Sequence, residues 1–232
     1  MHESGLCGPA QVDWSLYLVT DPRLGGGPDR VPGIVDAAVR GGVTVVQLRD
    51  KDASPGIFTA RAAELRSVIA DRVPLFVNDR VDTAVELGLH LHIGQDDMPY
   101  RTAREMLPAH CMIGLSVETT AHLDAVARDI ADGVRPPDVL GVGPVEQTST
   151  KPDAATPLGV TGVGTLAARA RILGIPTVAI GHVSTVNGAA LLGAGVDGLC
   201  TVSAVMAATD PSAAAHDLRA LIDDTFPLRE TA

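Results

Sequence analysis

The sequence is poor in aromatic residues and in cysteine. Phe, Trp and Tyr make up 3% of its 232 residues, so the core has to be built mainly from Ala, Val, Leu and Ile. Such a core suits a parallel sheet buried on both faces, because the strands of such sheets are apolar, β-branched runs. Cys7, Cys111 and Cys200 are widely separated and form no CxxC pair. We expect Cys111 and Cys200 to be small buried hydrophobes rather than metal ligands or nucleophiles.

The chain also lacks an excess of positive charge and long apolar runs. Its net charge of −10 argues against a nucleic acid or an anionic membrane as partner, because both favour a basic surface. No apolar run approaches the roughly 18 residues of a membrane span, and residues 1–15 show no signal-peptide pattern. We therefore expect a soluble, cytoplasmic protein. The sequence does not fix its oligomeric state, and a homo-oligomer is compatible with it.

Short β-branched runs alternate with Ala-rich segments of helical periodicity along the chain. This alternation predicts parallel strands joined by right-handed crossovers. Eight such units in this length predict an α/β fold, a single-domain (β/α)₈ TIM barrel, whose usual length is about 250 residues. An open doubly wound sheet is the alternative, but no strand is followed by GxGxxG. The predicted strands are 15–20, 44–49, 75–79, 90–94, 112–117, 139–144, 177–181 and 198–203, and the clearest helices are 57–70, 119–131, 165–173 and 184–193.

Glycines mark the points where helices should stop, as at Gly41-Gly42, Gly88 and Gly195, each just before a predicted strand. No linker or low-complexity stretch divides the chain. We therefore expect an N-terminal extension at 1–14, a barrel at 15–225 and a tail at 226–232. A long loop is expected at 147–164, after the sixth strand.

Polar residues gather where the predicted strands end, which is the catalytic edge of such barrels. The second strand ends in VVQLRDKD, and alternation places Gln47, Arg49 and Lys51 on one face while Val46 and Leu48 face the helices. An amide, a guanidinium and an ammonium at this edge would form a cradle for a diphosphate. The alternative is a solvated charged loop, because acidic residues interleave with the basic ones. Burying Arg49 without an anionic partner would be costly, which favours the cradle.

The third and fourth strands end in acidic side chains. Asn78 and Asp79 follow one strand and Asp96 and Asp97 follow the next. Two carboxylates from neighbouring strands, facing phosphate-binding groups, suggest Mg²⁺, which takes one or two carboxylates together with water and phosphate oxygens. Helix capping by Asn78 or Asp79 is the alternative interpretation.

The two histidines of the fourth strand, His90 and His92, lie on one face, so a zinc pair has to be considered. No further histidine at a strand end completes such a site, and a hydrogen-bonding role for one and packing for the other is the preferred interpretation. Ser116 lies near the mouth in the fifth strand, and Glu118 and Thr119 form a capping pattern for the next helix. No GxSxG elbow supports a hydrolase triad.

The last three strands lead into groups suited to phosphate. A hydroxyl-rich loop ending in a cation, Thr148 to Lys151, follows the sixth strand. A flexible Ser/Thr loop is the alternative there. Loops after the seventh and eighth strands of such barrels often bind phosphate through backbone N–H groups, which singles out Gly181, Val202 and Ser203. The edge thus carries two candidate anion sites and a carboxylate pair.

Taken in order, the motifs YLVTD, GGVTVVQLRDK, VNDRVD, HIGQDD, GLS, GVGP…TSTK, AIG and GAGVDGL resemble the thiamine-phosphate synthase family. They extend from about Tyr17 to Ser203. The resemblance implies a barrel that condenses hydroxymethylpyrimidine diphosphate with a thiazole phosphate, giving thiamine phosphate and pyrophosphate. It also implies a dissociative, carbocation-like mechanism assisted by Mg²⁺, in which the protein neutralises the departing diphosphate.

The resemblance also implies roles for individual residues. Arg49, Lys51, Ser116 and Lys151 would be catalytic, and Asp79 and Asp97 would ligate Mg²⁺. The pyrimidine diphosphate would be bound by Gln47, Arg49, Lys51, Asn78, Ser116 and Lys151, and the thiazole phosphate by Thr148, Ser149, Thr150, Gly181, His182, Val202 and Ser203.

The chain departs from the family pattern at two places. His182 stands where the family usually has a second glycine, and Val145-Glu146-Gln147 replace an aromatic and a proline before the first threonine of the loop. Two other functions stay open: a thiazole tautomerase on the same fold, for which His122 would be the candidate proton-transfer group, and a non-catalytic barrel that binds thiamine precursors. The first would not need the full set of diphosphate and metal residues.

Overall fold

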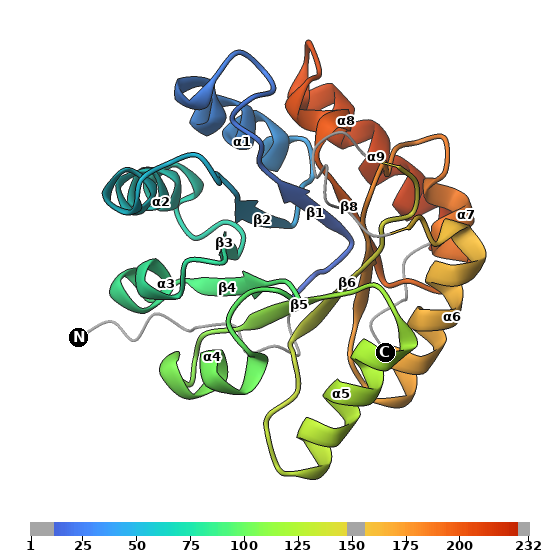
Figure 1. Ribbon diagram of the computed structural model, residues 1–232. Coiled ribbons are helices and arrows are strands. Elements are labelled where there is room, and N and C mark those ends of the chain that lie inside the picture. The colour runs from blue at the N-terminus through green and yellow to red at the C-terminus, as the bar shows by residue number, and fades with distance from the viewer. Residues whose placement is uncertain (1–11, 148–155, 227–232) are drawn as a thin grey trace, which may run out of the picture.

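Eight parallel strands close into a barrel in the computed structural model, which describes residues 12–147 and 156–226. The strands follow one another around the barrel in sequence order, and β8 returns to pair with β1 through Tyr17 opposite Cys200. The strands form an inner ring and the helices lie outside it (Figure 1). The predicted single-domain (β/α)₈ barrel is therefore confirmed.

Every observed strand lies inside a predicted one. The strands are β1 (Leu16–Val19), β2 (Val45–Leu48), β3 (Leu75–Asn78), β4 (His90–Ile93), β5 (Ile113–Val117), β6 (Val139–Val142), β7 (Thr177–Ala179) and β8 (Gly198–Thr201). The helices are η2 (Pro28–Arg30), α1 (Val31–Arg40), α2 (Pro55–Ile69), α3 (Val81–Leu87), α4 (Tyr100–Met106), α5 (Thr120–Ala131), α6 (Gly159–Ile172), α7 (Gly188–Gly193), α8 (Ser203–Met206) and α9 (Pro211–Thr225).

Two helix starts differ from the prediction by more than two residues. Helix α6 begins at Gly159 rather than at Thr165, so the long loop predicted at 147–164 was wrong in its last part. The glycine-rich start of this helix has low helix propensity, which hid it from the sequence pattern. Helix α7 begins at Gly188, and Ser184 to Asn187 form a turn before it. The predicted domain boundaries at 14 and 226 remain predictions.

The core has two parts, separated by the strands. Alternate strand residues point into the barrel, where Tyr17 and Phe76 pack with ring centroids 5.7 Å apart and Trp14 covers them. The other strand residues, such as Leu16 and Leu18, point outward against the helices. The side-chain period of two in a strand produces this division. Cys111 and Cys200 are both buried and free, as predicted.

The glycines predicted to end helices do so. Gly88 ends α3 with φ +63°, and Gly42 follows α1 with φ +110°. Both values lie in the region that favours glycine because it carries no Cβ.

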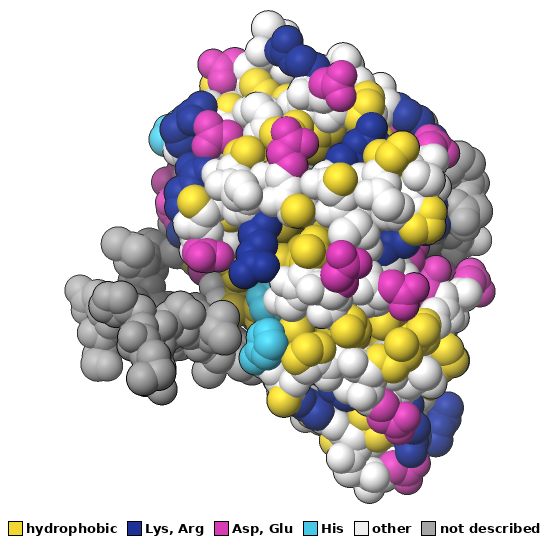
Figure 2. All heavy atoms as spheres, turned by 90° about the vertical axis from the view of Figure 1, so that its left-hand side faces the viewer, with side chains coloured by type: hydrophobic (Ala, Val, Ile, Leu, Met, Phe, Trp, Pro, Cys, Tyr) yellow, Lys and Arg dark blue, Asp and Glu magenta, His cyan; other side chains and the backbone are white. Residues whose placement is uncertain are grey.

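Acidic and basic side chains are interspersed on the face shown in Figure 2, and no broad basic patch forms there. This distribution agrees with the negative net charge. Among the helices of the described residues, none has the length and apolarity needed to cross a membrane.

A buried cluster of charged side chains stabilises the end of the barrel at which the strands begin, opposite their carboxyl ends. Asp138, just before β6, accepts hydrogen bonds from the backbone N–H of Ile113 (2.7 Å) and from the guanidinium groups of Arg104 (2.8 Å) and Arg135 (2.6 Å). Its side chain is only 2% exposed, so a single carboxylate is surrounded by donors.

Asp138→Ala should lower the free energy of unfolding by about 3 kcal/mol, because Arg104 would be left buried without its counter-ion. Chemical denaturation measures this change. Asp132→Ala is the matched control, because Asp132 pairs with Arg101 on an exposed surface and its loss should have little effect. Equal effects of the two substitutions would contradict the anchoring role of Asp138.

Candidate active site

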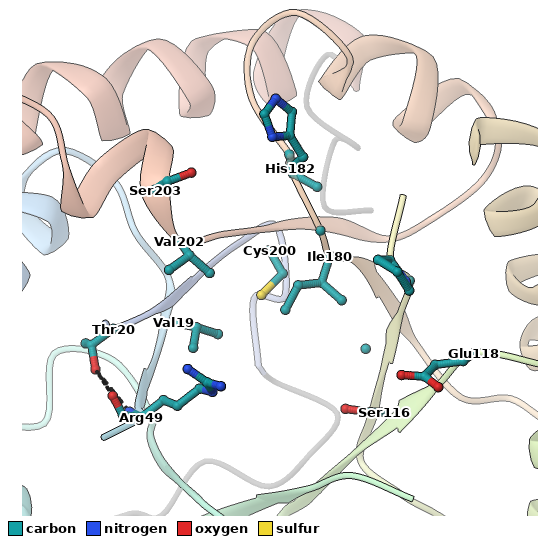
Figure 3. A pocket seen from close by; sticks show the side chains of 15 residues that line it. Val19, Thr20, Arg49, Ser116, Glu118, Ile180, His182, Cys200, Val202 and Ser203 are labelled. Carbon is teal, nitrogen blue, oxygen red and sulfur yellow. Dashed lines mark hydrogen bonds between the residues drawn. The ribbon is translucent and has the colours of Figure 1, made fainter. Parts of the chain in front are cut away.

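A pocket opens at the carboxyl ends of the strands, with about 800 Å³ of empty space including its open mouth. This is the edge at which the sequence placed the polar residues. Figure 3 shows Arg49 and Ser116 on one side of the pocket and His182 and Ser203 on the other. The lining residues are Val19, Thr20, Arg49, Ser116, Glu118, Gly141, Gly143, Pro144, Ile180, Gly181, His182, Val183, Cys200, Val202 and Ser203.

The end of β2 has the predicted alternation. Val46 and Leu48 pack against the helices, whereas Gln47 faces the barrel interior and its Nε2 donates to the Tyr17 hydroxyl at 3.1 Å. Arg49 is the next residue on the inner face, and its guanidinium is directed into the pocket (Figure 3). Gln47 is only 3% exposed, so it lies beneath the pocket rather than in its wall.

The loop that follows β2 is held by a buried carboxylate. Asp50 accepts hydrogen bonds from the backbone N–H groups of Asp52 (3.2 Å) and Ala53 (3.1 Å). Its other oxygen pairs with Arg61 of α2. The acidic residue that suggested a solvated loop is therefore an anchor for the backbone between Arg49 and Lys51.

Lys51 lies beside the carboxylates that end β3 and β4. Its Nζ is 3.7 Å from Asp79 Oδ2. Burial, together with a hydrogen bond to Asp97 and the charge of Asp97, raises the pKa of Asp79 to about 7, and Lys51 and Asn78 only partly oppose this rise. The two carboxyl groups therefore lie close together, and Lys51 offsets only part of the cost of a negative charge on Asp79.

Neither Asn78 nor Asp79 caps α3, so the capping interpretation was wrong. The N-cap position is Arg80, which makes no side-chain capping bond. Asp79 has φ +60°, and its backbone N–H donates to the His92 carbonyl at 2.9 Å. Its carboxyl group is thus turned toward Asp97 rather than back onto the helix. Asp97 is itself fixed, since its Oδ2 accepts from Gly94 N at 2.7 Å.

This carboxylate pair fits Mg²⁺. The ion takes one or two carboxylates and completes its shell with water and phosphate oxygens, and it would supply the positive charge that the pair lacks. Within 12–147 and 156–226, no group of three or more His, Cys, Asp or Glu side chains is arranged to hold a metal. A zinc site on His90 and His92 therefore finds no support among the described residues.

Both histidines of β4 make a hydrogen bond and contact an aromatic ring, so the expected division between one hydrogen-bonding and one packing histidine was wrong. His92 Nε2 lies 3.1 Å from Ser116 Oγ, beneath the pocket. Gly114 makes room for this ring, because a Cβ there would collide with it. His90 accepts from Met112 N at 3.1 Å and packs on Phe76. Burial lowers the pKa of His90 to about 4, so it is neutral at physiological pH.

The opposite rim is built from the loops after β7 and β8. Gly181 and His182 both have positive φ, +102° and +59°, and a Cβ at Gly181 would collide with Pro144. Asn187 fixes this loop: its Nδ2 donates to the His182 carbonyl (3.0 Å) and to Glu146 Oε1 (3.1 Å). The imidazole of His182 is exposed and directed away from Arg49 (Figure 3).

The predicted site residues divide into three groups. Arg49, Ser116, Gly181, His182, Val202 and Ser203 line the pocket. Gln47, Lys51, Asn78, Asp79 and Asp97 belong to the strand ends and loops beside or beneath it. Thr148, Ser149, Thr150 and Lys151 lie outside the described residues. The ligand roles of all three groups remain predictions.

Three pocket residues with polar or ionisable side chains, Thr20, Glu118 and Cys200, were not among the predicted site residues. Thr20 is a polar residue at the end of β1, and the rule that selected the other strand ends would have found it. Glu118 was interpreted only as part of a capping pattern. Cys200 points its thiol toward the pocket (Figure 3), and burial raises the pKa of that thiol well above its usual range, so it stays neutral.

His122 has a local structural role. Its Nδ1 accepts from Glu118 N at 3.2 Å, and its own N–H donates to the Thr119 hydroxyl at 3.3 Å. Thr119 is the N-cap of α5, so the predicted capping pattern is confirmed.

Comparison with known proteins gives consistent results. The family model for thiamine monophosphate synthase matches residues 16–205. The thiamine-phosphate synthase of Chloroflexus aurantiacus is 44% identical over 92% of this chain and 95% of its own length. The thiamine biosynthesis multifunctional protein ThiED of Corynebacterium glutamicum is 56% identical over 93% of the chain, which spans only 28% of that relative. The structure of thiamine phosphate pyrophosphorylase from Pyrococcus furiosus superimposes with a TM-score of 0.78 at 31% identity, covering 93% of this chain and 98% of that one.

The left-handed backbone at His182 has a measurable cost. His182→Gly should be more stable than His182→Ala by about 1 kcal/mol, because only glycine adopts this φ without a Cβ penalty. Thermal unfolding of the two variants measures the difference. Ala190, at an exposed position of α7, is the control: Ala190→Gly should be less stable than the unaltered protein. If the glycine variant is the less stable one at both positions, strain at His182 is ruled out.

Proposed function

The chain belongs to the thiamine monophosphate synthase family, and we propose that it joins hydroxymethylpyrimidine diphosphate to a thiazole phosphate, forming thiamine phosphate and releasing pyrophosphate. The observation that carries the proposal is the convergence of Arg49, Lys51 and the Asp79–Asp97 pair at one edge of the barrel. A guanidinium and an ammonium suit the anionic oxygens of a diphosphate.

In the proposed complex the diphosphate is bound by Arg49 and Lys51, with Asn78 as a further hydrogen-bonding group, while the predicted ligand Gln47 supports the site from beneath through its bond to Tyr17. Lys51 already lies 3.7 Å from Asp79, so the bound diphosphate and the carboxylates would share its charge. Asp79 and Asp97 would hold Mg²⁺, which when bound supplies positive charge to the diphosphate oxygens. Lys151 would complete the cationic set.

The thiazole phosphate occupies the opposite rim in this proposal. Gly181, Val202 and Ser203 line the pocket there, and backbone N–H groups of such loops suit a phosphate. His182 would add its imidazole at the outer edge. Thr148, Ser149 and Thr150 would contribute hydroxyl groups.

The reaction needs no protein nucleophile. The C–O bond between the pyrimidine methylene and the diphosphate breaks, and both bonding electrons leave with pyrophosphate. The thiazole nitrogen then forms the new C–N bond with the pyrimidine carbocation. Arg49 and Lys51 stabilise the departing negative charge, and the pocket holds the two reactants together. Ser116, whose hydroxyl lies 3.1 Å from His92 Nε2, would stand beside the pyrimidine.

The two alternative functions fit less well. A tautomerase that binds only the thiazole phosphate would leave the Arg49, Lys51 and carboxylate set unused. Its candidate proton-transfer residue, His122, is engaged in the local structure at the start of α5. A barrel that binds thiamine precursors without catalysis is distinguished from a synthase by measuring whether pyrophosphate is released when both substrates are present.

The direct test is to mix both substrates with Mg²⁺ and follow pyrophosphate. Release should require both substrates and Mg²⁺ together. Arg49→Ala should lower kcat/KM about 100-fold or more, by the magnitude usual for loss of a charge-stabilising group. Arg101→Ala, at an exposed arginine of α4, is the matched control and should leave the rate unchanged. No release from the unaltered protein, or full activity of Arg49→Ala, would refute the proposal.

The metal assignment is tested separately with Asp97→Asn. The amide oxygen can still accept from Gly94 N, so the loop should keep its shape, while the lost charge should weaken Mg²⁺. We expect the Mg²⁺ concentration for half-maximal activity to rise about tenfold, with an unchanged melting temperature. Asp96→Asn, at the exposed neighbouring residue, should leave the titration unaltered. An unaltered titration in Asp97→Asn would remove this residue from the proposed ligands.

A further inference from the structure

The hydroxyl group of Thr20 bonds to both sides of the Arg49 backbone. Arg49 N donates to Thr20 Oγ1 at 3.0 Å, and Thr20 Oγ1 donates to the Arg49 carbonyl at 3.3 Å (Figure 3). Thr20 N also donates to the Gln47 carbonyl at 2.9 Å. Because β1 ends at Val19 and β2 at Leu48, the hydroxyl extends the ladder beyond the last residues of both strands. A hydroxyl can do this since it is both donor and acceptor.

Arg49 needs such a constraint because it lies between two cavities. It lines the proposed substrate pocket and also a second cavity between the mouth of the barrel and helices α1 and α2. Thr20 lines both cavities as well. The second cavity has about 680 Å³ of empty space including solvent, and its wall contains Asp29, Asp50 and Glu64. Of these, Asp50 is paired with Arg61.

Those carboxylates would attract a guanidinium, and Arg49 is the residue within reach of both spaces. The direction in which its side chain leaves the main chain is set by its Cα–Cβ bond, and the backbone conformation restricts which rotamers it can adopt. Thr20 holds that backbone at the N–H and at the carbonyl, and its side chain is fully buried. Water therefore has little access to compete for these bonds.

We propose that Thr20 is a positioning residue, whose hydroxyl holds the Arg49 backbone so that the guanidinium faces the substrate pocket rather than the neighbouring acidic cavity. This inference rests on the proposed function, because it assigns to Arg49 the binding of the diphosphate substrate.

The test compares Thr20→Val, which keeps the branched shape and removes the hydroxyl, with Thr20→Ser, which keeps the hydroxyl. In Thr20→Val the KM for the pyrimidine diphosphate should rise about tenfold, the change expected from losing about one good hydrogen-bonding constraint. The KM for the thiazole phosphate should stay unchanged. Thr20→Ser should bind the pyrimidine diphosphate with nearly the original KM.

Thr83→Val is the control for simple loss of a buried hydroxyl. Thr83 is buried on α3, in the layer of helices outside the barrel, and its hydroxyl oxygen lies 2.8 Å from that of Thr59 on α2. This variant should lose stability without any change in either KM. Melting temperatures of all the variants separate the loss of stability from the loss of substrate binding.

Titration with inorganic pyrophosphate and Mg²⁺ gives a second measurement that does not depend on turnover. Binding should weaken in Thr20→Val and remain in Thr20→Ser and Thr83→Val. Equal KM values and equal pyrophosphate binding in Thr20→Val and the unaltered protein would overturn the inference. The inference is also overturned if the KM values for both substrates rise together in Thr20→Val, or if Thr20→Ser raises the KM for the pyrimidine diphosphate as much as Thr20→Val does.

Failure of the proposed function would look different. If the unaltered protein releases no pyrophosphate from the two substrates, the synthase assignment fails. The pyrophosphate titrations of the Thr20 variants then test the positioning role independently of turnover. If Arg49→Ala is impaired while Thr20→Val is normal, the synthase assignment stands and the positioning role is refuted.

Discussion

The backbone hydrogen bonds that close the barrel between β8 and β1 are the constraint on which the site depends. Closure places the carboxyl ends of all strands around one opening, and the side-chain period of two sends every second residue inward. Residues as distant in sequence as Thr20 and Ser203 therefore line one pocket. Without closure, the polar ends of the strands would be spread along the edge of an open sheet.

Electrostatics at this opening is balanced between unlike groups. Arg49 and Lys51 supply positive charge, while burial and the neighbouring Asp97 raise the pKa of Asp79 to about 7. In the proposed complex an anion with several oxygens would complement the first pair, and a divalent cation would complement the second. The proposed ligands thus complement each other, and neither alone would leave the site balanced. The buried anchors of the surrounding backbone, Asp50 and Thr20, keep these charges in place.

Much of the fold could be predicted because most strands are short runs rich in apolar residues, with glycine, proline or polar residues at their ends. The positions of Arg49, Ser116 and Ser203 in the pocket could be predicted because each lies at or near the carboxyl end of a predicted strand. Features created by tertiary contact could not be read from the chain: Gln47 lies beneath the pocket, bonded to Tyr17, and Asp79 turns toward Asp97 instead of capping a helix. The start of α6 was missed because its glycines carry little helical signal. Thr20 was overlooked although its place at a strand end was visible in the sequence.

The central claim is that this opening binds a diphosphate together with a divalent cation. Isothermal titration of the protein with inorganic pyrophosphate, in the presence and in the absence of Mg²⁺, tests it most directly. We expect measurable binding that tightens at least tenfold when Mg²⁺ is present. Binding that is independent of Mg²⁺, or no binding under either condition, would contradict it.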